Sequence, residues 1–391
     1  MGVAMTTDVH QDSRIFSPVE RLVTDPSEDK PELGIALCLS GGGYRAMVFH
    51  LGALMRLNEL GYLPRLARVS SVSGGSITAG VLAVNWGKLN FDDKGVARNF
   101  QQAVTAPIRN LASKTIDATA ILEGLLLPGT VADKVRAAYQ QYLFGHATLQ
   151  DIPDSPRFVF NATNVQSLAL WRFSKPYMRD YRVGEVRHPK VELAMAVAAS
   201  SAFPPVLSPA ELRLDAASYT PESGADLQRE PFTTDVVLTD GGVYDNLGLE
   251  TAWKRYATIL VSDGGGAYVP EPEPKRDWAR HSYRILSLID NQVRSLRKRQ
   301  IIASFRRGDR QGAYWGVRTQ IADYGLVDSL PCPSDHTLGL AQTPTRLKRL
   351  EPEQQERLIN WGYAVCDAAV RKHVLPDAGK PAGFPYPAAG V

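Results

Sequence analysis

The chain has 391 residues, of which 44% are hydrophobic, so it can bury the core of one large α/β domain or two medium ones. Charged residues make up 22% and the formal net charge is only +3, which excludes the strongly basic composition typical of nucleic-acid-binding proteins. The three cysteines lack metal-ligand spacing, no signal-peptide pattern opens the chain, and no apolar run reaches the length of a membrane span. We therefore expect a soluble protein of the reducing cytoplasm.

The two ends differ in composition from the rest. Residues 1–30 are polar and contain prolines, so they are predicted to form a flexible N-terminal segment. Residues 374–391 are rich in Pro, Ala and Gly and are predicted to form a tail outside the core. The folded domain is expected to span residues 31–373, with a helical insertion at about residues 94–150.

Short apolar runs alternate with helical patterns along this domain. A strand is predicted at 34–39 and a helix at 44–60, which Gly61 ends. The second strand, 68–72, runs into a small-residue helix start at 76–82. Later apolar runs predict strands at 158–162, 236–238 and 259–261. This alternation predicts an α/β fold with a mostly parallel central sheet and helices on both faces.

Three consecutive glycines, Gly41, Gly42 and Gly43, stand between the first strand and the first helix. Backbone N–H groups in such a turn converge on an anion, either a phosphate or an oxyanion. The nucleotide-binding pattern Gly-x-x-x-x-Gly-Lys-Ser/Thr is absent, and the match to Gly-x-Gly-x-x-Gly is poor. An oxyanion hole for acyl transfer is the better physical use of this turn.

The second strand ends in Ser71-Val72-Ser73-Gly74-Gly75, which resembles the nucleophile elbow Gly-x-Ser-x-Gly. An elbow needs small residues around its serine, because the nucleophile lies on a strained turn between a strand and a helix. Ser73 would then present its hydroxyl at the positive end of the next helix. The alternative is a Ser/Gly linker that caps this helix.

Two Asp-Gly-Gly turns follow predicted strands, one beginning at Asp240 and the other at Asp263. Active sites of open α/β sheets gather where strands end, so a carboxylate in this position could take the proton of Ser73. Geometry alone permits either residue, and such a sequence is most often only a turn.

These three elements, in this order, resemble the patatin-like phospholipase family, whose signatures are a Gly-Gly-Gly-x-Arg/Lys loop, a serine elbow and an Asp-Gly-Gly/Ala turn. The segments 160–164, 198–205 and 240–248 (DGGVYDNLG) are also similar, and the resemblance covers roughly residues 33–265. It implies a modified α/β-hydrolase fold, a three-layer sandwich, that works with a Ser–Asp dyad and without a metal or another cofactor.

The resemblance assigns roles residue by residue. Ser73 matches the nucleophile, Asp240 the dyad aspartate, and Gly41, Gly42, Gly43 and Arg45 the oxyanion loop. It implies a lipid acyl hydrolase, a phospholipase A or lipase-type esterase, that acts on a lipid or other ester. Because DGGVYDNLG matches the dyad segment, Asp263 is interpreted as a structural or rim carboxylate. For Arg45 we favour ordering of the loop over attraction of a phospholipid head group. The departure from the pattern is Ser71, where the family usually has glycine.

Two other function classes stay open. A carboxylesterase or peptidase with a Ser–His–Asp triad is one, because triad partners need only be close in space. Against it, His50 lies inside the first helix and the other six histidines have no motif around them. The second class is a non-catalytic lipid- or protein-binding scaffold. A histidine base is expected to ionise near neutrality and an aspartate base at lower pH.

Two helical regions suggest contacts with lipid. The apolar residues of the insertion are expected to line or cover the acyl site: Ile121, Leu122, Leu125, Leu126 and Leu127. The region 281–306 is basic, and a solvated face is favoured there over contact with an anionic membrane. Transient contact with a membrane surface, and therefore a peripheral location at membranes, stays an alternative. The sequence does not indicate the oligomeric state.

Overall fold

The computed structural model describes residues 31–116, 130–266 and 270–391. Its sheet has the strand order β10-β9-β1-β2-β3-β4-β5-β6, with β8 attached to β3 and β7 attached to β8. The strands are β1 (Glu32–Leu39), β2 (Arg68–Ser71), β3 (Arg157–Asn164), β4 (Ala169–Phe173), β5 (Tyr177–Asp180), β6 (Gly184–Arg187), β7 (Ala210–Arg213), β8 (Asp235–Asp240), β9 (Tyr256–Asp263) and β10 (Gln311–Gly316).

Helices follow most of these strands. The α-helices are α4 (Gly43–Glu59), α5 (Gly74–Asn85), α6 (Ala106–Ala112), α8 (Val131–Tyr139), α9 (Leu193–Ser200), α10 (Gly242–Asp245), α11 (Glu250–Trp253), α12 (Trp278–Arg307), α13 (Ser334–Ala341) and α14 (Pro352–His373). Short helical turns complete the list: η1 (Leu63–Arg65), η2 (Trp86–Lys88), η3 (Gln101–Thr105), η4 (Gln140–Phe144), η5 (Ala216–Ser218) and η6 (Ile321–Tyr324). The strand–turn–helix units predicted at the first two turns are therefore present.

The strands β10, β9, β1, β2 and β3 pair in parallel, as the alternation of strands and helices predicted. The strands at the other side, β4, β5 and β6, pair antiparallel. The strand before Asp240 departs from the parallel arrangement, because β8 runs antiparallel to β3. The position and direction of β8 depend on the strand with which it pairs, and a pattern of apolar residues does not specify that strand.

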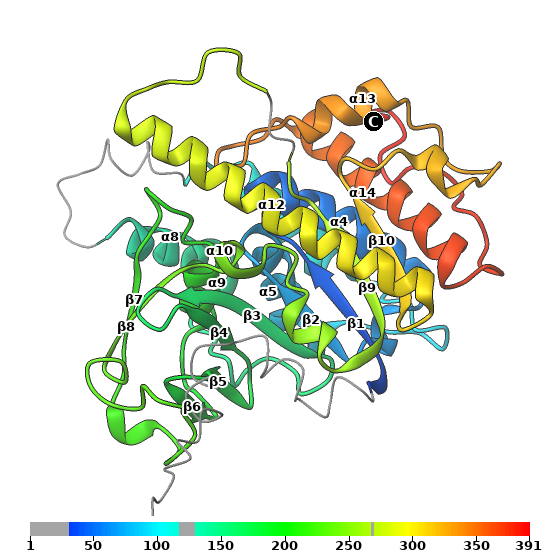
Figure 1. Ribbon diagram of the computed structural model, residues 1–391. Coiled ribbons are helices and arrows are strands. Elements are labelled where there is room, and N and C mark those ends of the chain that lie inside the picture. The colour runs from blue at the N-terminus through cyan, green and yellow to red at the C-terminus, as the bar shows by residue number, and fades with distance from the viewer. Residues whose placement is uncertain (1–30, 117–129, 267–269) are drawn as a thin grey trace, which may run out of the picture.

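The sheet has helices on both faces, which makes three layers. Successive side chains of β1 point to opposite faces, so Leu37 and Leu39 pack in one core and Ala36 and Cys38 in the other. Helices α4, α5 and α14 cover the first face, while α11 and α12 cover the second. Figure 1 shows α12, the long yellow helix, lying across the sheet. This is the three-layer architecture that the resemblance implied.

The C-terminal residues 374–391 depart from the prediction that they lie outside the core. Val391 is buried in the main core, and Phe384 and Tyr386 pack against it. Buried Asn360 on α14 donates to the carbonyls of Tyr386 at 2.8 Å and Gly390 at 2.6 Å. A buried amide requires such partners, so the tail folds back onto α14. The predicted flexible segment 1–30 and the apolar patch 121–127 lie outside the described residues.

Candidate active site

The candidate site lies where two strands meet on the same edge of β3. On one edge, β3 pairs with β4. On the other edge, β2 pairs with residues 157–160 and β8 pairs with residues 162–164, from the opposite direction. β2 ends with Ser71 opposite Phe160, and β8 ends with Asp240 opposite Ala162. The turns after these two strands therefore face each other, which brings Ser73 to Asp240.

Ser73 has the strained backbone expected of a nucleophile elbow. Its φ of 51° and ψ of −121° place it among only four non-glycine residues with positive φ in the described part of the chain. Helix α5 starts at the next residue, so the hydroxyl lies at the positive end of the helix. A Cβ on Gly74 would lie 2.2 Å from the carbonyl oxygen of Gly43, which is why the two turns can pack only with glycine there.

Asp240 is a buried carboxylate of which only one oxygen accepts a well-formed hydrogen bond from the described residues. Oδ1 accepts the backbone N–H of Gly242 at 2.7 Å, and the side chain is only 1% exposed. Oδ2 has no hydrogen-bond partner at full bonding geometry within the described residues. Burial raises the pKa of Asp240 to about 7, against smaller lowering effects of the Gly242 N–H and of the nearby Ser73 hydroxyl. Such a carboxylate is a stronger base than a solvated one.

Asp263, in the second Asp-Gly-Gly turn, has its oxygens occupied. Tyr314 donates to Oδ2 at 2.7 Å, Gly265 N–H donates to Oδ1 at 2.9 Å, and Arg294 forms an ion pair at 3.5 Å. Burial raises the pKa of this carboxyl, but the Arg294 charge and the Tyr314 hydrogen bond outweigh burial and hold it below its ordinary value. These contacts favour a structural role for Asp263, one of the two roles that the sequence analysis gave it.

Ser200 and Asn161 hold the two turns together, and the sequence analysis gave neither residue a role. The backbone N–H of Ser73 and that of Gly241 both donate to the Ser200 carbonyl, at 3.1 and 3.3 Å. Asn161 donates to the carbonyl of Ser71 at 2.9 Å. The signal that pointed to these residues was the similarity of segments 160–164 and 198–205 to the family.

The three glycines of the first turn are not equivalent. The Gly41 N–H donates to the carbonyl of Asn246 at 3.0 Å, so it is already engaged. Gly42 and Gly43, with φ of 144° and 59°, adopt conformations that favour glycine and lie at the start of α4. The first N–H groups of a helix have no acceptor within the helix, so these two are available to an anion.

Arg45 is buried and binds loop backbone. Its Nε donates to the carbonyl of Gly264 at 3.0 Å, and one Nη donates to the hydroxyl of Thr345 at 2.8 Å. The other Nη donates to the carbonyl of Thr343. These bonds support the loop-ordering interpretation of Arg45 over capture of a head group.

His50 has both ring nitrogens occupied. Its Nε2 lies 2.9 Å from the carbonyl of Ser40, where it can only donate, and Nδ1 lies 2.8 Å from the hydroxyl of Ser262. Burial lowers the pKa of His50 to about 4, so the ring is neutral. No histidine among the described residues lines the cavity at Ser73.

Ser73 and Asp240 open into a cavity of about 580 Å³, a size typical of small-molecule sites. One wall is apolar and consists of Phe203, Pro204, Pro205, Val206, Leu207 and Leu347. Tyr283, Asp290 and Arg294 of α12 form another wall, and exposed Arg346 lines the cavity beside the glycine turn.

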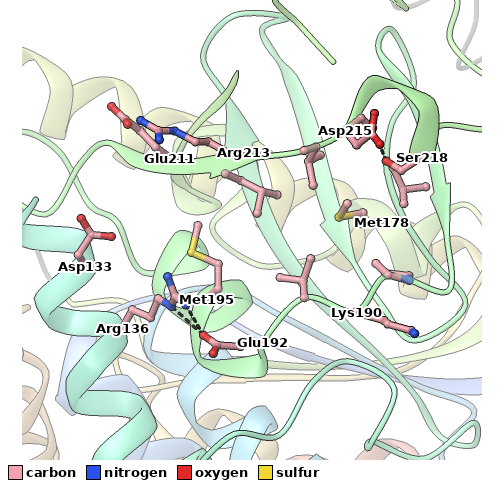
Figure 2. A pocket seen from close by; sticks show the side chains of 15 residues that line it. Asp133, Arg136, Met178, Lys190, Glu192, Met195, Glu211, Arg213, Asp215 and Ser218 are labelled. Carbon is pink, nitrogen blue, oxygen red and sulfur yellow. Dashed lines mark hydrogen bonds and ion pairs between the residues drawn. The ribbon is translucent and has the colours of Figure 1, made fainter. Parts of the chain in front are cut away.

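A second cavity is larger, about 750 Å³, but lacks a comparable pair of groups. Figure 2 shows Arg136 in contact with Glu192 and Asp215 in contact with Ser218. Arg136 Nε donates to Glu192 at 2.8 Å, and the Ser218 hydroxyl donates to the backbone carbonyl of Asp215 at 2.6 Å. The Ser218 hydroxyl thus donates to a backbone carbonyl rather than to a carboxylate, and the larger volume of this cavity does not make it the candidate site.

A family model described as patatin-like phospholipase matches residues 37–253, more than half of the chain. The chain belongs to the patatin-like phospholipase family. The matched region of this patatin-like chain contains the glycine turn, Ser73 and Asp240. It ends before Asp263, α12 and Arg346, so those parts of the cavity lie beyond the family match.

Solved structures resemble the patatin-like chain at low identity. Human GIVD cytosolic phospholipase A2 matches with 14% identity and a TM-score of 0.40, over 63% of this chain and 50% of that one. The same enzyme in complex with methyl gamma-linolenyl fluorophosphonate matches with 12% identity and a TM-score of 0.48, over 88% and 58%. VipD from Legionella pneumophila matches with 17% identity and a TM-score of 0.35, over 86% and 66%.

The patatin-like chain thus spans about half to two thirds of the length of these structures. No curated protein sequence matches it at a significant level. In the described residues, no group of His, Cys, Asp and Glu side chains is arranged to hold a metal ion. None of the helices in that part of the chain is long and apolar enough to cross a bilayer.

Proposed function

We propose that this patatin-like chain is a serine lipid acyl hydrolase of the phospholipase A or lipase type, with a catalytic dyad of Ser73 and Asp240. One observation carries the proposal. A serine on a strained elbow faces a buried carboxylate whose Oδ2 is unpaired within the described residues, at the base of a partly apolar cavity.

Acyl transfer would proceed in two halves. Asp240 takes the proton of Ser73 as Oγ attacks the ester carbonyl, and the proton then passes to the oxygen of the departing alcohol. Water attacks the acyl-enzyme in the second half, loses its proton to Asp240, and the Ser73 hydroxyl is restored as the acid leaves. The N–H groups of Gly42 and Gly43 at the positive end of α4 would hold the oxyanion in both halves.

The shape of the cavity supports a lipid ester as substrate. Its apolar wall, from Phe203 to Leu207, offers a surface on which an acyl chain loses contact with water. Arg346, which is exposed and also lines the cavity, offers a cation to the phosphate of a phospholipid. This combination favours a phospholipid over a short, neutral ester.

The two competing functions receive less support. A Ser–His–Asp triad needs a histidine beside the serine, whereas His50 is bonded through both ring nitrogens and is held by the first helix. A non-catalytic scaffold does not require a serine with strained backbone that faces a carboxylate whose pKa burial raises to about 7.

A covalent probe tests the proposal. A fluorophosphonate should label Ser73 in the wild-type protein, and Ser73→Ala should lose both the label and the hydrolysis of lipid esters. Ser71→Ala is the matched control, because Ser71 lies two residues away with its hydroxyl bonded to the carbonyl of Val159 at 3.3 Å. A label found on Ser71 or Ser76, or labelling that persists in folded Ser73→Ala, would show that the nucleophile is wrongly assigned.

A further inference from the structure

Helix α12 has two unlike faces. One face lines the cavity through Tyr283, Asp290 and Arg294, and further along it buries Ile301 in the second core. The opposite face carries an exposed apolar stripe of five large side chains: Trp278, Ile285, Leu288, Ile289 and Leu296. At 3.6 residues per turn these five lie within roughly a 100° sector of the helix surface.

This stripe is the reverse of what a surface helix ordinarily presents. A surface helix directs its apolar stripe to the core and its charges to water, yet Trp278 is 84% exposed and Leu288 is 61% exposed. Single exposed apolar residues are common, but five that are aligned over a long helix are not. The stripe therefore has the character of an interaction surface.

Charge identifies the kind of partner. Helix α12 contains eight Lys or Arg residues and one acid, Asp290, although the net charge of the whole chain is only +3. Three exposed cations lie in the same sector of the helix as the stripe: Arg299, Arg306 and Arg307. Arg280, which lines the cavity, and Lys298, which lies over the Tyr314 ring, are on the other side of the helix. Two copies of so basic a helix repel each other, which disfavours self-association through the stripe, whereas an anionic lipid surface attracts it.

We propose that α12 docks the protein on an anionic membrane surface, with the apolar stripe in the boundary between head groups and acyl chains. Arg299, Arg306 and Arg307 then face the lipid phosphates, and Trp278 lies at the interface, where tryptophan is favoured. Because the opposite face of α12 lines the cavity, docking holds the cavity about one helix diameter, roughly 10 Å, from the bilayer. The purpose of docking rests on the proposed function, but the binding itself does not.

Vesicle co-sedimentation tests the docking surface, with the full chain carrying Ser73→Ala so that no lipid is hydrolysed. We expect binding to vesicles that contain phosphatidylglycerol, weak binding to phosphatidylcholine alone, and loss of affinity with added salt. The triple variant Ile285→Ser, Leu288→Ser, Ile289→Ser should bind at least about tenfold more weakly, since each side chain loses apolar burial. Arg299→Gln with Arg306→Gln and Arg307→Gln should weaken only the binding to anionic vesicles.

Matched controls separate this surface from general stickiness and from catalysis. Val327 and Leu338 are also exposed apolar residues but lie outside α12, so Val327→Ser with Leu338→Ser should leave binding unchanged. With Ser73 restored, the stripe variant should keep wild-type turnover of a soluble short-chain ester. If the proposed function is wrong, neither the wild type nor any variant will hydrolyse that ester. Unchanged vesicle binding by the stripe variant overturns the proposal. So does a wild-type dimer that the stripe substitutions convert to a monomer.

Discussion

Ser200 binds Ser73, the proposed nucleophile, through two acceptors. The Ser73 backbone N–H donates to both the carbonyl and the Oγ of Ser200, each at 3.1 Å. The same carbonyl accepts the N–H of Gly241, the residue after Asp240. The end of α9 thereby fixes the elbow and the aspartate turn relative to each other, a geometry on which proton transfer depends.

Ser200→Ala keeps the carbonyl but removes the hydroxyl that Ser73, Ser76 and Asn161 share. We expect kcat to fall roughly tenfold with little change in KM, because the loosened elbow misplaces the Ser73 Oγ without altering the apolar wall of the cavity. Unfolding should become easier by about 1–2 kcal/mol. Ser174→Ala is the control, since its hydroxyl bonds the carbonyl of Tyr177 away from the site, and it should lower stability without changing kcat.

The two aspartates should respond in opposite ways to replacement by asparagine. Asp240→Asn removes the proton acceptor, so turnover should fall by roughly two to four orders of magnitude while the fold survives. Asp263→Asn leaves buried Arg294 with a neutral partner, so unfolding should become easier by about 3 kcal/mol while turnover is largely retained. Steady-state kinetics and chemical denaturation measure the two effects. If Asp263→Asn is folded but inactive, the catalytic base has been assigned to the wrong strand.

The pH dependence should follow Asp240. Burial raises its pKa to about 7, and only the ionised carboxylate accepts the Ser73 proton, so turnover should rise as pH increases through about 7. The sequence analysis expected an aspartate base to ionise below this range, but burial moves Asp240 into the range of histidine. A pH profile alone therefore does not separate the two bases, and the rise must vanish from the residual activity of Asp240→Asn.

Asp240 should also lower stability at high pH. Its folded pKa of about 7 exceeds the ordinary 3.8, so the unfolded state loses its proton first and the folded protein is destabilised as pH rises from 3.8 to about 7. At about 1.36 kcal/mol per pH unit, the ceiling is roughly 4 kcal/mol. Asp240→Asn should therefore unfold at higher temperature than wild type at pH 8, and the difference should shrink toward pH 4. An equal difference at both pH values contradicts the shifted pKa.

Arg346 should distinguish phospholipids from neutral esters. Its carbonyl accepts the N–H of Tyr44 at 3.0 Å, which fixes its backbone beside the glycine turn, and the residue lines the cavity and is exposed. Arg346→Gln should lower kcat/KM for phosphatidylglycerol roughly five- to tenfold and leave a neutral diacylglycerol unaffected. Lys348→Gln, an exposed cation two residues away that is not among the cavity-lining residues, is the matched control. Equal losses on both lipids would assign Arg346 to loop packing.

The elements that the sequence predicted are those whose cause is local. The sequence analysis required small residues around Ser73, and the structure shows carbonyls of the end of β1 and of the first turn where Cβ atoms on Gly74 and Gly75 would lie. The parallel strands β1, β2 and β9 were visible as apolar runs followed by helical patterns. The tail was predicted wrongly, because its low complexity obscured Tyr386 and Val391, which pack against the core.

The sequence by itself determined that Ser73 lies at a strained turn, because that conformation depends on its immediate neighbours. Only the tertiary structure placed Asp240 beside it, because β8 reaches β3 from the opposite direction to β2. Tertiary structure also separated Asp240 from Asp263. The two turns share one sequence pattern, yet only Asp263 gained Arg294 and Tyr314, which come from segments 31 and 51 residues away. A carboxylate's pKa depends on groups that the fold brings near, so the more basic of these two could not be identified from their turns alone.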